Sequence, residues 1–125
     1  MARILVVDDD NDTLWLVQLC LERAGHDVLG VRSPQKALEL VLEGELPEVA
    51  VLDVSMPEIS GLEVQQTLKL GFGMKALPVV FLSGRVEPEE IRAGQALGAI
   101  YLTKPFVGSA LLKAIDQALK PAPAK

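Results

Sequence analysis

Short apolar runs recur along the chain, and each of them ends in polar or turn-forming residues. They occupy positions 3–7, 27–31, 49–53, 79–83 and 99–103. Runs of this length that are rich in Val, Ile and Leu are typical of buried strands, and near-continuous apolar character is typical of strands covered on both faces. The run at 27–31 is the weakest because Gly30 interrupts it. The pattern therefore predicts a sheet of five mostly buried strands.

Segments with helical spacing separate these runs. We predict helices over about 11–24, 34–43, 61–70, 88–97 and 108–119, with Ser33 as an N-cap before Pro34 and with Gly25, Gly44 and Gly98 at helix ends. Strands that alternate with helices indicate βαβ units, and hence a parallel sheet with helices on both faces.

Apolar spacing also predicts which face each helix buries. For the first helix the predicted buried face is Thr13, Leu16, Val17, Cys20, Leu21 and Ala24, which leaves Leu14, Trp15, Gln18, Leu19 and Glu22 on the opposite side. The second helix is expected to bury Pro34, Ala37, Leu38 and Val41, and the last helix Leu111, Ala114, Ile115 and Ala118. The segment 61–70 is too mixed to predict a face.

Composition narrows the class of protein. The chain has 125 residues, half of them hydrophobic, which fits one globular domain. A net charge of -5 argues against direct nucleic-acid binding, and no apolar run is long enough to span a membrane. Cys20 is the only cysteine, and the N-terminal region shows no signal-peptide pattern, so we expect a reducing cytoplasm.

Reactive side chains follow four of the predicted strands. Asp8 and Asp9 follow the first, Asp53 ends the third, Ser83 ends the fourth and Lys104 follows the fifth. Because the carboxyl ends of parallel strands meet at one edge of a sheet, we expect these groups to converge. Three adjacent carboxylates repel one another unless a cation compensates, and oxygen ligands suit Mg²⁺.

These residues, in this order, make the chain resemble a response-regulator receiver domain of two-component signal transduction. The resemblance extends from Arg3 to about Leu119. It depends on the acidic pair after the first strand, on Asp-x-x-Met-Pro at 53–57, on Ser83-Gly84, and on Tyr-x-x-Lys-Pro at 101–105. It implies a flavodoxin-like doubly wound α/β fold with five parallel strands in the order 2-1-3-4-5 and five helices.

The resemblance also implies roles for these residues. Asp53 would accept a phosphoryl group from a phosphohistidine of a kinase or phosphotransfer protein. Asp9 would hold Mg²⁺ directly, Asp8 mostly through water, and the backbone carbonyl of Ser55 would complete the protein ligands. Lys104 and the Ser83 hydroxyl would contact the phosphoryl group, and Tyr101 would change rotamer and re-form the surface of the fourth helix, fifth strand and fifth helix. The expected protein is thus a phosphorylation-controlled switch rather than an enzyme, although it promotes its own phosphorylation and dephosphorylation.

Two further expectations concern boundaries and partners. Residues 1–120 would form the receiver domain, and the Pro/Ala-rich stretch 121–125 would be a tail or the start of a linker. Trp15 and Leu19, on the predicted exposed side of the first helix, would help to dock the phosphodonor or a second copy of the domain. An output domain is a further expected partner.

The acidic cluster also resembles other kinds of site. Asp8-x-Asp10 after a strand also resembles a haloacid-dehalogenase-type phosphatase with Asp8 as nucleophile and Asp10 as acid, although this explains neither 53–57 nor Lys104. An EF-hand is excluded because Thr13 stands at the loop's sixth position and Leu19 at its twelfth. A flavodoxin-like cofactor binder would place a phosphate against Asp8, Asp9 and Asp10. A degenerate receiver that only binds partners is disfavoured by the intact acidic, hydroxyl and lysine positions.

Overall fold

The chain folds around a central parallel sheet. The computed structural model describes residues 2–54, 61–68, 77–84, 89, 92 and 99–119. The strands are β1 (Arg3–Val7), β2 (Asp27–Val31), β3 (Val49–Asp53), β4 (Val79–Ser83) and β5 (Ala99–Thr103), all paired in parallel in the order β2-β1-β3-β4-β5. Fold class and strand order are those expected from the sequence.

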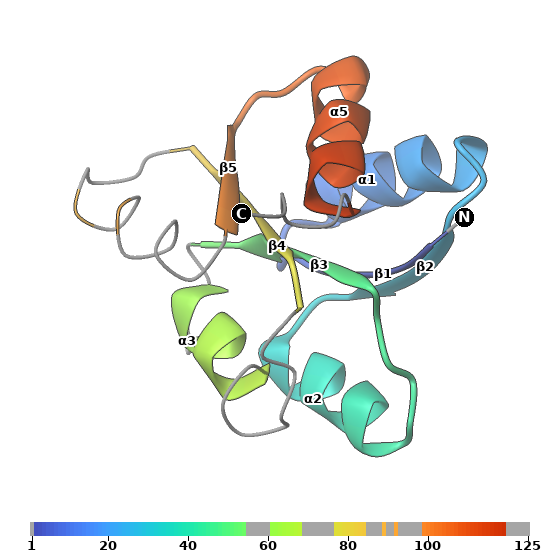
Figure 1. The fold of residues 1–125 in the computed structure, drawn as a ribbon, viewed down its shortest axis with the longest axis vertical. Coiled ribbons are helices and arrows are strands. Elements are labelled where there is room, and N and C mark those ends of the chain that lie inside the picture. Colours follow the sequence, from blue (N-terminus) through green and yellow to red (C-terminus); the bar gives the residue numbers. More distant parts are fainter. Residues whose placement is uncertain are drawn as a thin grey trace, which may run out of the picture.

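Helices cover both faces of the sheet. α1 (Asn11–Arg23) and α5 (Gly108–Leu119) lie on one face, and α2 (Pro34–Leu42) and α3 (Gly61–Gln66) lie on the other (Figure 1). The expected helix at 88–97 falls almost entirely outside the described residues, of which Glu89 and Arg92 are helical.

Strand side chains alternate between two apolar cores. Leu5, Leu52 and Phe81 face the α2 and α3 side, whereas Ile4 and Val51 face the α1 and α5 side. All residues of β3 and β4 are buried, which is why these strands read as continuous apolar runs rather than as alternating ones. Polar groups are consequently confined to the strand ends.

The ends of α1 and α2 follow local sequence signals. Ser33 caps α2 by accepting a hydrogen bond from the Lys36 amide, and Pro34 occupies the first turn, as predicted. Gly25 and Gly44 follow α1 and α2 with φ of 93° and 92°, a backbone region that a Cβ disfavours. Asp10 caps α1 by accepting hydrogen bonds from the amide and hydroxyl of Thr13.

The predicted buried face of α1 is partly wrong. Leu14 is buried with Val17 and Leu21, whereas Leu16 is 46% exposed; Ala24 is exposed and Cys20 only half-buried. The helix has apolar residues on every side, so periodicity alone did not determine its rotation.

Two lateral contacts of α1 accompany this rotation. The side chain of Gln18 lies where a Cβ on Gly30 of β2 would stand, and Cys20 Sγ lies 3.7 Å from the carbonyl oxygen of Gly108 at the start of α5. The helix face between these two contacts points toward the sheet. It carries Leu14, Val17 and Leu21, which are buried. The outer side of α1 therefore carries Trp15, Leu16 and Leu19.

The other predicted faces agree better with the structure. α2 buries Ala37 and Val41, with Pro34 and Leu38 half-buried. α5 buries Leu111, Ala114 and Ile115, with Ala118 half-buried. α3, for which no face was predicted, buries Val64, Gln65 and Leu68 on its described side chains.

Candidate functional site

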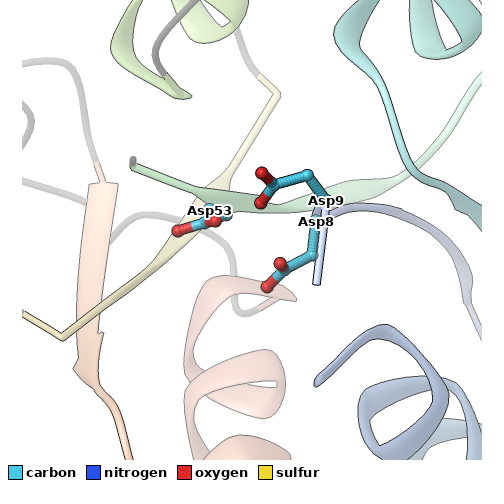
Figure 2. A group of neighbouring side chains, drawn as sticks. All are labelled: Asp8, Asp9 and Asp53. Carbon is cyan, nitrogen blue, oxygen red and sulfur yellow. The ribbon is translucent and has the colours of Figure 1, made fainter. Parts of the chain in front are cut away.

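Three aspartates meet at the carboxyl end of the sheet. β1 and β3 are neighbours, with Val7 opposite Leu52, so the residues that follow them lie side by side. Asp8, Asp9 and Asp53 each contribute a carboxylate oxygen, and these oxygens all lie within 4.8 Å of one another (Figure 2). The convergence expected from the strand ends is thus present.

Burial of the three carboxylates is uneven. Asp8 is 0% exposed and Asp53 is 5% exposed, whereas Asp9 is open to solvent. The Asp8 carboxylate accepts a hydrogen bond of 2.9 Å from the backbone N–H of Asp10. A site with two sealed acids and one solvent-facing acid concentrates negative charge where water screens it poorly.

Lys104 brings a positive charge to this cluster. Its Nζ lies 3.1 Å from Asp8 Oδ2 and 3.6 Å from Asp53 Oδ1. Burial by itself would lower the pKa of Lys104, but the hydrogen bond and charge of Asp8, together with the charge of Asp53, outweigh it, so the pKa is raised. Lys104 is therefore an ammonium at neutral pH.

The donor set fits a hard divalent cation. Three carboxyl groups face the ammonium of Lys104, so the acidic groups outnumber this basic group by two. Oxygen ligands close enough to share one ion, two of them fixed by burial, are what Mg²⁺ or Ca²⁺ requires. The fourth protein ligand expected from the sequence, the carbonyl of Ser55, lies outside the described residues, as do Met56 and Pro57 of the motif at 53–57.

Two further predicted site residues, Ser83 and Tyr101, belong to the neighbouring strands β4 and β5, and Lys104 directly follows β5. Ser83 ends β4 and is 2% exposed, and its carbonyl accepts a 2.8 Å hydrogen bond from the Lys104 amide. Tyr101 is half-buried in β5, with its ring 5.1 Å from that of Phe81. The hydroxyl and the aromatic side chain are thus carried by the neighbouring strands β4 and β5, and the ammonium by the residue that follows β5.

The sequence predicted that the charged groups converge, but not which of them touch. The ion pair between Lys104 and Asp8 joins residues 96 positions apart, and only the fold reveals that the two touch. Asp10, by contrast, is a helix cap, and the pKa of its carboxyl is lowered mainly by the hydrogen bond from the Thr13 hydroxyl.

Within the described part of the chain, no helix has the length and apolar character needed to cross a membrane.

Comparison with known proteins gives a consistent result. Residues 4–116 match the family model described as "Response regulator receiver domain". PilH of Pseudomonas aeruginosa is 32% identical, over 95% of this chain and 98% of its own length. The crystal structure of the chemotaxis protein CheY4 of Vibrio cholerae superposes with a TM-score of 0.87 at 31% identity, covering 95% of this chain and 99% of that one.

Longer proteins contain similar segments. The sensory/regulatory protein RpfC of Xanthomonas campestris is 39% identical over 88% of this chain, which spans only 15% of RpfC. PhoP of Bacillus subtilis, an alkaline phosphatase synthesis transcriptional regulatory protein, is 39% identical over 83% of this chain, which spans 42% of PhoP. The family match over nearly the whole chain, the sheet order and the cluster of acids beside a lysine lead to one conclusion: this chain belongs to the response regulator receiver domains of two-component signal transduction.

Proposed function

We propose that Asp53 accepts a phosphoryl group from a phosphohistidine of a sensor kinase or histidine phosphotransfer protein. A carboxylate oxygen of Asp53 attacks phosphorus, the P–N bond breaks, and the imidazole leaves with the bonding electron pair and takes up a proton. The observation that carries this proposal is a buried Asp53 carboxylate 3.6 Å from the Lys104 ammonium and beside two further acids.

The residues around Asp53 have distinct roles in this proposal. Lys104 would offset the negative charge of the incoming phosphoryl oxygens, and the Ser83 hydroxyl would donate a hydrogen bond to one of them. Asp8, Asp9, Asp53 and the Ser55 carbonyl would hold Mg²⁺, which when bound supplies further charge neutralisation at phosphorus. Asp8 and Asp9 then serve the site as ligands rather than as nucleophiles.

A two-state response would follow transfer. Ser83 gains a hydrogen-bond acceptor that exists only after phosphorylation, so the end of β4 moves toward Asp53. The ring of Tyr101 packs against Phe81, two residues before Ser83 on the same strand, and would change rotamer with it. The surface formed by β5, α5 and the expected fourth helix would change as a result and be recognised by an output domain or other partner.

Labelling tests the assignment. Acetyl phosphate with Mg²⁺, followed by borohydride trapping and mass spectrometry, is expected to modify Asp53 alone, with no modification in the absence of Mg²⁺. Modification of Asp8 would instead support the phosphatase alternative.

The lowered pKa of Asp10 and its use as a helix cap speak against the phosphatase alternative, because a general acid needs a carboxyl that retains its proton.

The outer side of α1 is the proposed docking surface for the phosphodonor. Trp15 is 64% exposed and Leu16 46% exposed, and Leu19 lies beside them half-buried. α1 begins at Asn11, directly after the acidic cluster, so a partner that rests on Trp15 and Leu19 would reach Asp53. Docking of a second copy of this domain on the same residues is the alternative occupant.

Substitution of Trp15 distinguishes docking from a structural role. Because Trp15 is mostly exposed, Trp15→Ala is expected to lower the free energy of unfolding by less than about 1 kcal/mol. Transfer from the phosphodonor should slow while labelling by acetyl phosphate is unchanged. A loss of roughly 3–5 kcal/mol, as for emptying a buried tryptophan site, would contradict the docking role.

The proposed domain is residues 1–120, with 121–125 as a tail or the start of a linker. The lengths of RpfC and PhoP are compatible with a receiver that belongs to a larger regulator, whereas PilH has the length of this chain. We propose no direct nucleic-acid contact for residues 1–120, because the net charge of the chain is -5. Cytoplasmic location stays a prediction from the sequence.

A further inference from the structure

Gln65 of α3 carries a buried primary amide that makes no hydrogen bond to any residue the structure describes. The residue is 0% exposed, and within the described part of the chain neither its Oε1 nor its Nε2 has a partner. A buried polar group without a partner has lost its hydrogen bonds to water and gained nothing in return, so it destabilises the conformation that contains it. Such groups are rare in folded proteins and call for a physical reason.

The helix that carries Gln65 becomes irregular two residues further on. α3 runs from Gly61 to Gln66, and residues 67–68 continue it as a π-helical turn. The Thr67 hydroxyl donates a 2.9 Å hydrogen bond to the carbonyl of Glu63. A π turn inserts one extra residue into a helix, and each residue of an α-helix advances the rotation by about 100°. If the π turn moves along the helix, the side chains that precede it therefore rotate about the helix axis.

α3 is connected to the proposed switch by packing. Val64 and Leu68, on the same helix as Gln65, share one core with Val54, which follows Asp53 directly. Phe81 belongs to this core as well, and its ring contacts Tyr101. A movement at Asp53 or at Tyr101 therefore changes the surface on which α3 rests.

We propose that α3 is a second two-state element. The buried Gln65 amide destabilises its conformation before phosphorylation, and phosphorylation removes this destabilisation. In the present conformation the Gln65 amide is buried and has no hydrogen-bond partner among the described residues. In the phosphorylated conformation α3 rotates at the π turn and the Gln65 amide gains hydrogen bonds. This proposal rests on phosphorylation of Asp53, and it adds a residue whose chemistry favours the phosphorylated conformation.

Paired substitutions test the role of the amide. Gln65→Leu removes it and keeps a side chain of similar length, and Gln66→Leu is the matched control because Gln66 is exposed on the same helix. Thermal melts would be recorded for wild type and both variants, each with and without beryllofluoride and Mg²⁺. Hydrogen exchange over residues 61–68 would be followed in parallel.

The expected outcome has two parts. Gln65→Leu should raise the melting temperature of the unmodified protein by roughly 4 °C or more and slow hydrogen exchange in α3, because an uncompensated amide has been removed. It should also shrink the increase in melting temperature that beryllofluoride causes in wild type. Gln66→Leu should change neither quantity.

Contrary outcomes separate this inference from the proposed function. If Gln65→Leu leaves the melting temperature unchanged or lowers it, or if the beryllofluoride-induced increase matches that of wild type, the role of Gln65 is wrong although Asp53 still responds. If wild type itself shows no response to beryllofluoride and Mg²⁺, the proposed function is wrong, and the link between Gln65 and Asp53 falls with it.

Discussion

The two ends of the sheet gather similar charges and differ in burial. At the amino end, Arg3 lies 3.2 Å from Asp27 and 2.9 Å from Glu45. At the carboxyl end, Lys104 lies 3.1 Å from Asp8 and 3.6 Å from Asp53. The distances are alike, but the exposure of the side chains differs. At the amino end it is 40% for Arg3, 66% for Asp27 and 44% for Glu45. At the carboxyl end it is 24% for Lys104, 0% for Asp8 and 6% for Asp53.

Burial rather than charge composition therefore distinguishes the reactive end. Water screens the ion pairs of Arg3, and such pairs contribute little to stability. Lys104 and its two ion-pair partners interact with weaker screening, so each of these groups depends on the others being present. A set of charges that depend on one another in this way can respond when one more charge, such as a phosphoryl group, arrives.

The largest expected effect comes from removing one cation at each end. Lys104→Met leaves Asp8 and Asp53 without their ammonium, so we expect the free energy of unfolding in Mg²⁺-free buffer to fall by about 2–4 kcal/mol. Arg3→Met should lower it by less than about 1 kcal/mol. Urea denaturation of both variants measures the difference.

Added Mg²⁺ sharpens this contrast. It should restore part of the stability of Lys104→Met, because it neutralises the same carboxylates, and leave Arg3→Met unaffected relative to wild type. Equal losses in the two variants would show that burial does not separate the two ends.

A smaller and opposite effect is expected at Asp9. Asp9→Asn removes one of three mutually repelling carboxylates, so the metal-free protein should gain about 1 kcal/mol of stability. The same change removes a Mg²⁺ ligand, so the increase in melting temperature that Mg²⁺ causes should shrink. Melts of both proteins with and without Mg²⁺ give the answer, and equal Mg²⁺-induced increases would refute the metal site.

The smallest expected effect is a dependence on high pH. Because the pKa of Lys104 is raised in the folded protein, its stabilising contribution is complete below about 10.4, the ordinary lysine value in an unfolded chain, and is lost as the pH rises through the folded value. Arg3 stays charged over this range. Urea denaturation between pH 8 and 11 should therefore show a steeper decline for wild type and Arg3→Met than for Lys104→Met, and parallel declines in all three would contradict it.

The sequence predicted the buried strands and the residues at their ends correctly where the apolar pattern is compatible with only one placement of the side chains. β3 and β4 are apolar up to their last residues, so their burial and the position of Asp53 and Ser83 at their ends could be predicted. α1 was misread because Leu14, Trp15, Leu16 and Val17 are consecutive apolar residues, and only lateral contacts of Gln18 and Cys20 choose among them.

Long-range and exceptional features could not be predicted in the same way. The contact of Lys104 with Asp8 needs the strand order and the geometry of both loops, whereas the motif around Lys104 indicated only that it would face the acids. The buried Gln65 opposes the usual preference of amides for solvent, so no pattern of apolar residues points to it. Features that oppose local preferences of this kind are where function is most often found.

One main-chain hydrogen bond bears on which anions this site would hold. The amide of Lys104 donates to the carbonyl of Ser83, so the residue that carries the ammonium and the residue that carries the hydroxyl are mechanically coupled across the strand ends. We expect a displacement of either residue to be passed to the other through this hydrogen bond, so that both groups close on an anion together. We expect an anion with several oxygens, which can contact both the Lys104 ammonium and the Ser83 hydroxyl, to bind more tightly than a halide, which can contact only one of them.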